Sequence, residues 1–267
     1  MEKLTILGTG SAMVTKCYNT CFTISDNTEH FLVDAGGGNT ILVNLEKANI
    51  NIDKIKHMFI SHTHGDHILG APWVIRAVAT KIAKKSYDGI FTVYGEKSVL
   101  DAIKTICNFV LKKKFLDMFG KEIIFKEVSG GQTLNILGRD TTFFDIKSTK
   151  LLQYGFKTTL LNGKSLVFIG DEPYREEEKD YALNTDYLLH EAFCLYSEKD
   201  KYKPYEKHHA TAKDACANAT LVNAKNVIIY HTEDDNLDKR KDLYTNEGKT
   251  EFTGNIIVPD DLEIIEL

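Results

Sequence analysis

The sequence contains no long apolar run, few prolines and no repeat, and each absence narrows what the protein can be. No stretch approaches the roughly 20 apolar residues that a membrane-spanning helix needs, and the N-terminal apolar stretch Leu4–Leu7 is too short for a signal-peptide core. The 4 prolines are scattered through 267 residues, and no Gly-rich linker or low-complexity tract marks a boundary. We therefore expect a single domain over residues 1–267, located in the cytoplasm.

Cysteine is also sparse. The 5 cysteines are an odd number spread over a long chain, which argues against a disulfide framework and for a reducing compartment. Cys17 and Cys21 are four residues apart, but no second pair of Cys or His lies at a matching distance. These two residues are therefore read as small buried hydrophobes rather than as zinc ligands.

The charge balance gives no general attraction to nucleic acid or membrane. Lys and Arg number 33 against 38 Asp and Glu, a net charge of −5, and hydrophobic residues make up 43% of the chain, as in ordinary globular proteins. The distribution is uneven, because residues 81–126 contain ten Lys and five acidic residues. A solvated helix face explains this excess; a rim that attracts phosphate is the alternative.

Strand-like and helix-like patterns alternate along the chain. Short apolar or alternating segments bounded by turns predict strands, and apolar residues at helical spacing predict helices between them in both halves. This interleaving favours an α/β protein, a four-layer αββα sandwich of two mixed β-sheets. The predicted strands are 4–7, 21–24, 31–33, 57–60, 90–94, 122–126, 141–146, 156–161, 165–169, 187–189 and 227–230. The predicted helices are 41–48, 68–83, 175–182, 211–219 and 237–244, together with a helix or helix pair over 98–114.

The most informative segment runs from Ser61 to His67, directly after a predicted strand. It places His62, His64, Asp66 and His67 within six positions, a density that chance explains poorly. A solvent-facing turn does not need three imidazoles, and a buried turn could not satisfy them without a metal or many polar partners. Imidazole and carboxylate are the ligands expected for zinc. His62 and His64 can chelate one ion while Asp66 and His67 turn toward a second.

A catalytic site of this kind needs ligands from elsewhere in the chain, and two other strand ends offer them. Asp171 follows the predicted strand 165–169, and His231 follows the predicted strand 227–230. Alone, each has an ordinary explanation, as a turn residue or a surface histidine. Because loops at strand ends are where functional sites sit, three strand ends with ligand side chains favour the metal site.

Short motifs that recur in order across almost the whole chain resemble those of the metallo-β-lactamase fold superfamily. The motifs are Leu7-Gly8-Thr9-Gly10-Ser11, Leu32-Val33-Asp34-Ala35-Gly36, the cluster from His62 to His67, Gly170-Asp171, His190-Glu191-Ala192, His209-Ala210-Thr211 and His231. The cluster points to the superfamily, and the His-Glu-Ala and His-x-Thr elements point to its ribonuclease Z-like branch.

The resemblance implies a hydrolase with two zinc ions. It places His62 and His64 on the first ion, Asp66, His67 and His231 on the second, and Asp171 between them. Asp34, which follows a buried strand, is expected to orient a ligand histidine rather than to bind metal.

Two departures from the branch shape the functional prediction. Where the branch has a further histidine ligand to the first ion, this chain has Thr149, so we expect that site to be weak, empty, or completed by water or Thr149. Lys147 and Lys150 lie nearby and are read as solvated, although either could place a fixed positive charge there. The tRNA-gripping arm of the branch is also missing, because only a hairpin turning at Asn162-Gly163 fits between Gly155 and Asp171.

These features favour a zinc-dependent phosphodiesterase that cleaves a nucleotide or cyclic nucleotide, as in the armless anti-Pycsar relatives of the branch. The ions would activate a water for in-line attack. The resemblance implies that His209, polarised by donating a hydrogen bond to the Glu191 carboxylate, protonates the leaving alkoxide. Asp66 is expected to accept a proton as well as to bind metal.

Several alternatives remain open at this stage. They are a tRNA 3′-end endonuclease, a hydrolase of a lactone or thioester, and a non-catalytic metal or nucleotide binder. The expected partners are a small nucleotide or short nucleic acid, without a membrane. A homodimer is expected because dimers are common in the branch.

Overall fold

The computed structural model describes residues 2–26 and 28–267, and Met1 and Asn27 lie outside the described residues. The chain divides into two compact units. The first unit contains residues 1–8, 18–128 and 261–267, and the second contains residues 9–17 and 129–260. Each unit is built on its own β-sheet.

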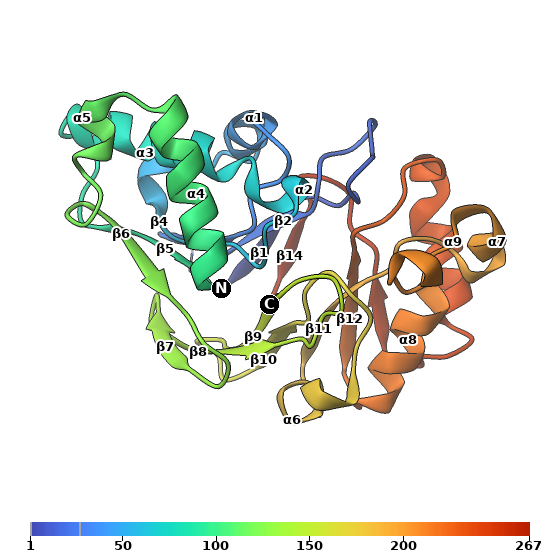
Figure 1. The fold of residues 1–267 in the computed structure, drawn as a ribbon. Coiled ribbons are helices and arrows are strands. Elements are labelled where there is room, and N and C mark those ends of the chain that lie inside the picture. The colour runs from blue at the N-terminus through green and yellow to red at the C-terminus, as the bar shows by residue number, and fades with distance from the viewer. Residues whose placement is uncertain (1, 27) are drawn as a thin grey trace. The chain divides into compact units, whose positions relative to one another are not determined.

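The sheet of the first unit has seven strands in the order β14-β1-β2-β3-β4-β5-β6. Strands β14, β1, β2 and β3 pair antiparallel, whereas β3, β4, β5 and β6 pair parallel, so the sheet is mixed (Figure 1). The strands are β1 (Lys3–Gly8), β2 (Cys21–Ser25), β3 (His30–Val33), β4 (Ile55–Phe59), β5 (Phe91–Gly95), β6 (Ile123–Glu127) and β14 (Ile264–Glu266).

The sheet of the second unit also has seven strands, in the order β13-β12-β11-β10-β9-β8-β7. Strands β7 to β10 pair antiparallel and β10 to β13 pair parallel. The strands are β7 (Thr133–Ile136), β8 (Arg139–Asp145), β9 (Tyr154–Thr159), β10 (Ser165–Phe168), β11 (Tyr187–Glu191), β12 (Asn226–Tyr230) and β13 (Asn255–Ile257).

Helices pack on the first sheet because each presents one apolar face. The face of α4, for example, buries Val99, Leu100, Ile103 and Cys107, and α4 packs on β5 and β6. Burial of such side chains contributes about 1.5–3 kcal/mol each. The helical elements of this unit are α1 (Thr40–Lys47), η1 (Ile52–Lys54), α2 (Gly65–Ile68), α3 (Ala71–Ala83), α4 (Lys97–Val110) and α5 (Lys113–Leu116).

In the second unit, α8 packs on β11 and β12, and α9 packs on α8 and β13. Thr211 caps α8, because its hydroxyl accepts from the Asp214 backbone N–H while the Asp214 carboxylate accepts from Thr211. The helical elements are η2 (Glu176–Glu178), α6 (Lys179–Ala182), η3 (Tyr196–Glu198), α7 (Lys199–Tyr202), η4 (Tyr205–Lys207), α8 (Ala212–Leu221), η5 (Leu237–Lys239) and α9 (Arg240–Gly248).

The predicted pair of mixed sheets with interleaved helices is confirmed, with three local corrections. The helix predicted over 68–83 is broken at Gly70, where a Cβ would meet the Ala35 carbonyl oxygen at 1.8 Å. The segment carrying Asp66 and His67 is not a loop but the short helix α2. The helices predicted over 175–182 and 237–244 each begin with a 3₁₀ turn.

The hairpin predicted at Asn162-Gly163 is present between β9 and β10, with Gly163 at φ +83°. The stretch between Gly155 and Asp171 therefore contains a turn and no arm. Across the described residues, no helix has both the length and the apolar character to cross a membrane.

Candidate functional site

In the first unit, Asp34 organises the segment that carries the predicted ligands. Asp34 follows β3 in the left-handed conformation, at φ +54°. Its Oδ1 accepts from the Ser61 backbone N–H at 2.8 Å, and its Oδ2 accepts from the Ser61 hydroxyl at 2.8 Å and contacts His67 Nδ1 at 2.7 Å. The carboxylate thus holds both ends of the 61–67 segment, and the expected contact of Asp34 with a histidine is confirmed.

This network also fixes which ring nitrogens are available to a ligand. Because the Ser61 hydroxyl donates to Asp34, its oxygen accepts from His62 Nδ1, 2.9 Å away. His62 Nε2 then carries a lone pair. In the same way, a proton on His67 Nδ1, directed at Asp34, leaves Nε2 of that ring available. Ordered imidazole lone pairs are what a divalent ion requires.

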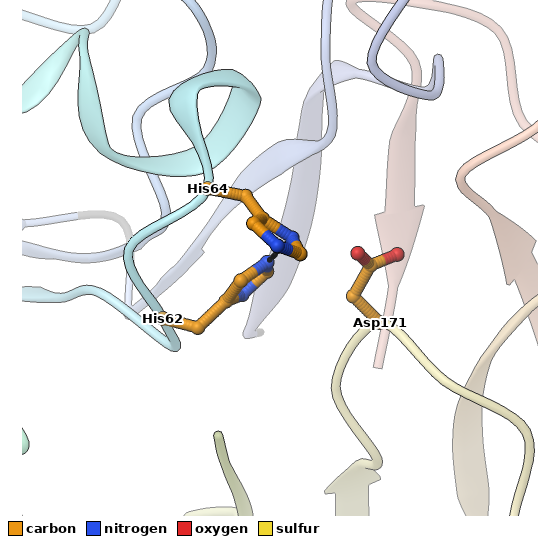
Figure 2. Close-up of side chains that lie close together, drawn as sticks. All are labelled: His62, His64 and Asp171. Carbon is orange, nitrogen blue, oxygen red and sulfur yellow. Dashed lines mark hydrogen bonds between the residues drawn. The ribbon is translucent and has the colours of Figure 1, made fainter. Parts of the chain in front are cut away.

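His62 and His64 converge on one point. Figure 2 shows the two rings side by side, nearly perpendicular at 81°, and His62 Nε2 lies 3.0 Å from His64 Nδ1. Two nitrogens bound tetrahedrally to one zinc at about 2.0 Å lie roughly 3.3 Å apart. Their separation therefore suits a shared ion.

His67 and Asp66 form the second group in this unit. His67 Nε2 lies 3.3 Å from Asp66 Oδ2, and the His67 ring centroid is 4.2 Å from that of His62. Burial alone would lower the pKa of His67, but the carboxylates of Asp34 and Asp66 outweigh burial and raise it well above its usual value. The pocket around His67 therefore favours a cation.

In the second unit, Asp171 and His231 come from loops that follow β10 and β12, the two strands on either side of β11. Asp171, labelled in Figure 2, follows β10 after Gly170, whose φ is +80°. Its backbone N–H donates to Gln153 Oε1 at 3.3 Å. His231 follows β12 in the left-handed conformation, at φ +59°. Asp171 Oδ1 lies 3.0 Å from His231 Nε2, and both side chains are buried.

His209 lies next to this pair. Its ring contacts that of His231 with centroids 5.0 Å apart, and Asp171, His209 and His231 each offer a ligand atom within 4.8 Å of the others. His209 Nδ1 is 3.6 Å from Glu191 Oε2, while Glu191 Oε1 accepts from the Ala210 backbone N–H. The distance to Glu191 is an ion-pair distance, so the predicted hydrogen bond is not formed; catalytic contacts often tighten only when substrate is bound.

Thr149, which stands where the branch has a further histidine, contacts a different histidine. Thr149 Oγ1 lies 3.1 Å from Nδ1 of His208, a residue that sequence reasoning left unassigned. Lys147 is exposed and pairs with Asp145 at 2.9 Å, which fits the solvated interpretation. The side chain of Lys150 is also exposed.

Sequence reasoning missed three residues that position the others. Ser61 connects Asp34 to His62, and Phe193 stacks on His209 with centroids 5.3 Å apart. Arg240 is buried and donates to the hydroxyls of Thr9, at 2.9 Å, and Thr232, at 2.8 Å, the residue after His231. Neither a serine beside histidines nor a lone Arg in a helix has a sequence signal of its own.

The residues present fit a divalent metal within each unit. The first unit provides imidazoles oriented by a buried serine and carboxylate, and the second provides a buried carboxylate with two imidazoles. This is the nitrogen and oxygen donor set that zinc accepts. The assignment of each residue to an ion stays a prediction.

Known proteins with similar sequences or folds place this arrangement in context. Ribonuclease Z of Nanoarchaeum equitans is 28% identical over 268 residues, which cover 85% of this chain and 82% of that protein. The metallo-β-lactamase fold protein YhfI of Bacillus subtilis has a TM-score of 0.79 at 16% identity, covering 99% of this chain and 98% of that one. The short form of human tRNase Z has a TM-score of 0.76 at 18% identity, with coverage of 99% and 98%.

The predicted metallo-β-lactamase sandwich, the ribonuclease Z-like branch and the class of metal-dependent hydrolase are confirmed. A more specific assignment comes from the family model described as anti-Pycsar protein Apyc1, which matches residues 2–254. Because the match takes in both β-sheets except β13 and β14, together with all of the predicted ligands, the chain belongs to this anti-Pycsar Apyc1 family.

Proposed function

We propose that the protein is a phosphodiesterase that cleaves a nucleotide or cyclic nucleotide. The observation that carries this proposal is the placement of His209 and Glu191 beside Asp171 and His231. A proton donor next to metal ligands is useful where an alkoxide departs, as in phosphodiester hydrolysis. Membership of the ribonuclease Z-like branch supports the same class of substrate.

The proposal includes two zinc ions held by the six predicted ligands. His62 and His64 would bind the first ion, Asp66, His67 and His231 the second, and Asp171 both, as the resemblance to the branch implies. When bound, such ions supply activated water at neutral pH and neutralise charge in the transition state. In this scheme Asp34 holds His67 through Nδ1, and Ser61 holds His62.

Proton transfer to the leaving oxygen would fall to His209. Phe193 stacks on one side of this ring and Glu191 Oε2 lies 3.6 Å from Nδ1, so rotation of the imidazole is restricted. The Glu191 carboxylate is placed to fix the orientation of the ring through Nδ1. This leaves Nε2 as the nitrogen that would donate a proton to the leaving oxygen.

A tRNA 3′-end endonuclease is the second candidate, because curated relatives such as that of Nanoarchaeum equitans carry the name ribonuclease Z. The short β9–β10 hairpin argues against it, since it leaves no arm to grip a folded RNA. A lactone or thioester hydrolase and a non-catalytic binder fit less well, because neither has an evident use for Glu191 and His209.

The test combines metal content with hydrolysis of bis(p-nitrophenyl) phosphate for the wild type, His64→Ala and His231→Ala. Near two zinc ions per chain, with activity lost in both variants, is the expected result. One zinc per chain, lost only in His231→Ala, would replace the two-ion scheme by a mononuclear one. No turnover by the zinc-loaded wild type would overturn the proposal that the protein is a phosphodiesterase.

A labelled precursor tRNA distinguishes the two nuclease-type candidates. We expect the precursor to stay uncut at enzyme concentrations that turn over bis(p-nitrophenyl) phosphate rapidly. Accurate cleavage at the 3′ end of the tRNA body would favour the endonuclease instead.

The proposed assembly is a homodimer. Phe109 and Val110, adjacent at the end of α4, are 86% and 59% exposed, and together they offer apolar surface that a second chain could cover. Sedimentation equilibrium should give twice the chain mass of 30.1 kDa, and a mass of one chain at micromolar concentration would contradict a dimer. A cytoplasmic location likewise stays a prediction.

A further inference from the structure

A cavity of about 370 Å³ lies in the second unit, beside His209 and His231. Its volume falls within the range of small-molecule sites, roughly 300–1,000 Å³. Apolar side chains form part of its wall, and a belt of acidic residues forms another part. The lining residues used below are Ala12, Met13, Phe193, Tyr202, Lys207 and Glu233.

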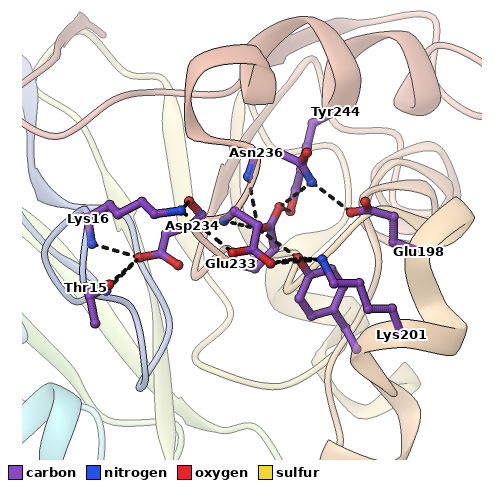
Figure 3. A network of polar contacts seen from close by, with 10 residues as sticks. Thr15, Lys16, Glu198, Lys201, Glu233, Asp234, Asn236 and Tyr244 are labelled. Carbon is purple, nitrogen blue, oxygen red and sulfur yellow. Dashed lines mark hydrogen bonds and ion pairs between the residues drawn. The ribbon is translucent and has the colours of Figure 1, made fainter.

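The acidic residues of this wall are occupied in holding loops together, as Figure 3 shows. Asp234 Oδ2 accepts from the backbone N–H groups of Thr15 and Lys16 at 2.6 and 2.8 Å. Glu233 accepts from the backbone N–H groups of Asp235 and Asn236. The carboxylates of Glu233 and Asp234 already accept hydrogen bonds from backbone N–H groups, so they are not suited to bind a ligand.

The remaining acid is paired with lysines from neighbouring segments. Asp235 Oδ2 accepts from Lys201 Nζ at 2.9 Å and from the Tyr202 hydroxyl at 2.7 Å, and its Oδ1 lies 3.8 Å from Lys16 Nζ. Tyr202 in turn meets Phe193 edge to face, with centroids 6.0 Å apart. The ammonium groups of Lys16 and Lys201 are therefore already paired with Asp235.

Lys207 is the cation of the cavity that has no carboxylate partner among the described residues. Its ammonium lies over the Phe193 ring, 4.7 Å from the centroid, and it makes no ion pair with residues 2–26 or 28–267. Phe193 stacks on His209, so the ammonium and the imidazole are held by the same ring. An exposed cation–π contact is worth only about 0.5–1 kcal/mol, which leaves the ammonium available for an anion.

We propose that Lys207 binds a non-bridging phosphate oxygen of the substrate and that the adjoining cavity takes the organic group esterified to that phosphate. This inference rests on the proposed phosphodiesterase function. A lysine ammonium is a compact point charge suited to phosphate, and the apolar wall of Met13 and Phe193 suits a sugar or base.

The first test compares two chromogenic diesters that share a leaving group: methyl p-nitrophenyl phosphate and thymidine 5′-p-nitrophenyl phosphate. Lys207→Ala should raise KM about ten-fold for both, the loss expected for one charge-assisted hydrogen bond, with kcat changed less than KM. Lys207→Arg should restore most of the binding.

The control is Lys203→Ala, which removes an exposed lysine outside the cavity wall. Equal KM for Lys207→Ala and Lys203→Ala would overturn the role of Lys207.

The second test fills the cavity. Ala12 is an exposed lining residue, so Ala12→Trp should fold normally while occupying space. We expect its KM to rise about ten-fold more for the thymidine diester than for the methyl diester. An equal change for both diesters would mean that the organic group lies elsewhere.

A binding measurement separates failure of this inference from failure of the proposed function. Titration calorimetry of the full-length chain with thymidine 5′-monophosphate needs no turnover. About ten-fold weaker binding by Lys207→Ala than by the wild type supports the inference even if neither diester is cleaved. Equal affinity of the two proteins, or no binding by the wild type, would overturn it.

Discussion

At the scale of single residues, the geometry of the candidate site depends on side chains outside the predicted ligand set. Asp34 connects the end of β3 to Ser61 and His67 through three contacts of 2.7–2.8 Å. The candidate ligands from His62 to His67 could be picked out by their spacing, because three histidines and an aspartate in six positions are rare. Ser61, Phe193 and Lys207 could not, because their roles come only from the three-dimensional contacts they make.

Asp34→Asn tests whether the carboxylate orients His67. Asn tolerates the left-handed backbone of position 34, so the substitution removes charge and acceptor strength with little strain. Loss of such a supporting contact typically lowers metal affinity about 10- to 100-fold. We expect that decrease in competition with a chromophoric chelator.

The control for this experiment is Asp88→Asn, because Asp88 is exposed in the same unit and far along the chain from the cluster. Zinc affinity of Asp34→Asn equal to that of Asp88→Asn would show that the contact with His67 is merely structural.

At the scale of elements, the parts of the fold that could be predicted from the sequence are those with a strong local pattern. Every strand expected from apolar periodicity is present within two or three residues, and the helix or helix pair over 98–114 is the pair α4 and α5. Strands β7, β13 and β14 were missed, because they are three or four residues long and lie at or next to sheet edges. Their pairing comes from tertiary contacts rather than from local preference.

Glu178, at the junction of η2 and α6, is a buried carboxyl group that should make the stability of the protein depend on pH. It is 1% exposed, and its Oε2 makes no hydrogen bond within the described chain. Burial raises its pKa well above the usual 4.5, although Arg175 acts in the opposite direction. The folded state therefore binds a proton more tightly than the unfolded state, so Glu178 lowers the free energy of unfolding as pH rises above 4.5.

Glu178→Gln should accordingly raise the free energy of unfolding at pH 7 by about 1 kcal/mol and change it little at pH 4, because the amide remains neutral throughout. Urea denaturation at several pH values measures this difference. The exposed neighbour Glu177→Gln is the matched control. A constant offset between Glu178→Gln and the wild type from pH 4.5 to pH 7 would contradict the raised pKa.

At the scale of the whole molecule, the predicted ligands are divided between the two units. His62, His64, Asp66 and His67 belong to the first, and Asp171 and His231 to the second. Their places after predicted strands suggested Asp171 and His231 as ligands, and the order of motifs along the chain, compared with a known family, assigned each of them to an ion. The same comparison predicted the missing arm, which the short hairpin between β9 and β10 confirms.

This division predicts that metal binding and global stability are coupled through both ligand sets. An ion bound only by the folded chain stabilises it by about 2.7 kcal/mol at a free concentration about 100 times Kd, which corresponds to several degrees in Tm for a chain of this size. We expect zinc to raise Tm by roughly that amount in differential scanning calorimetry, and chelation to reverse it. His231→Ala should lose a large part of the zinc-dependent increase. His57→Gln, a half-buried histidine outside the ligand set, should keep it. If His231→Ala kept the full increase, the ions that stabilise the chain would be bound without His231, and the proposed ligand set would be wrong.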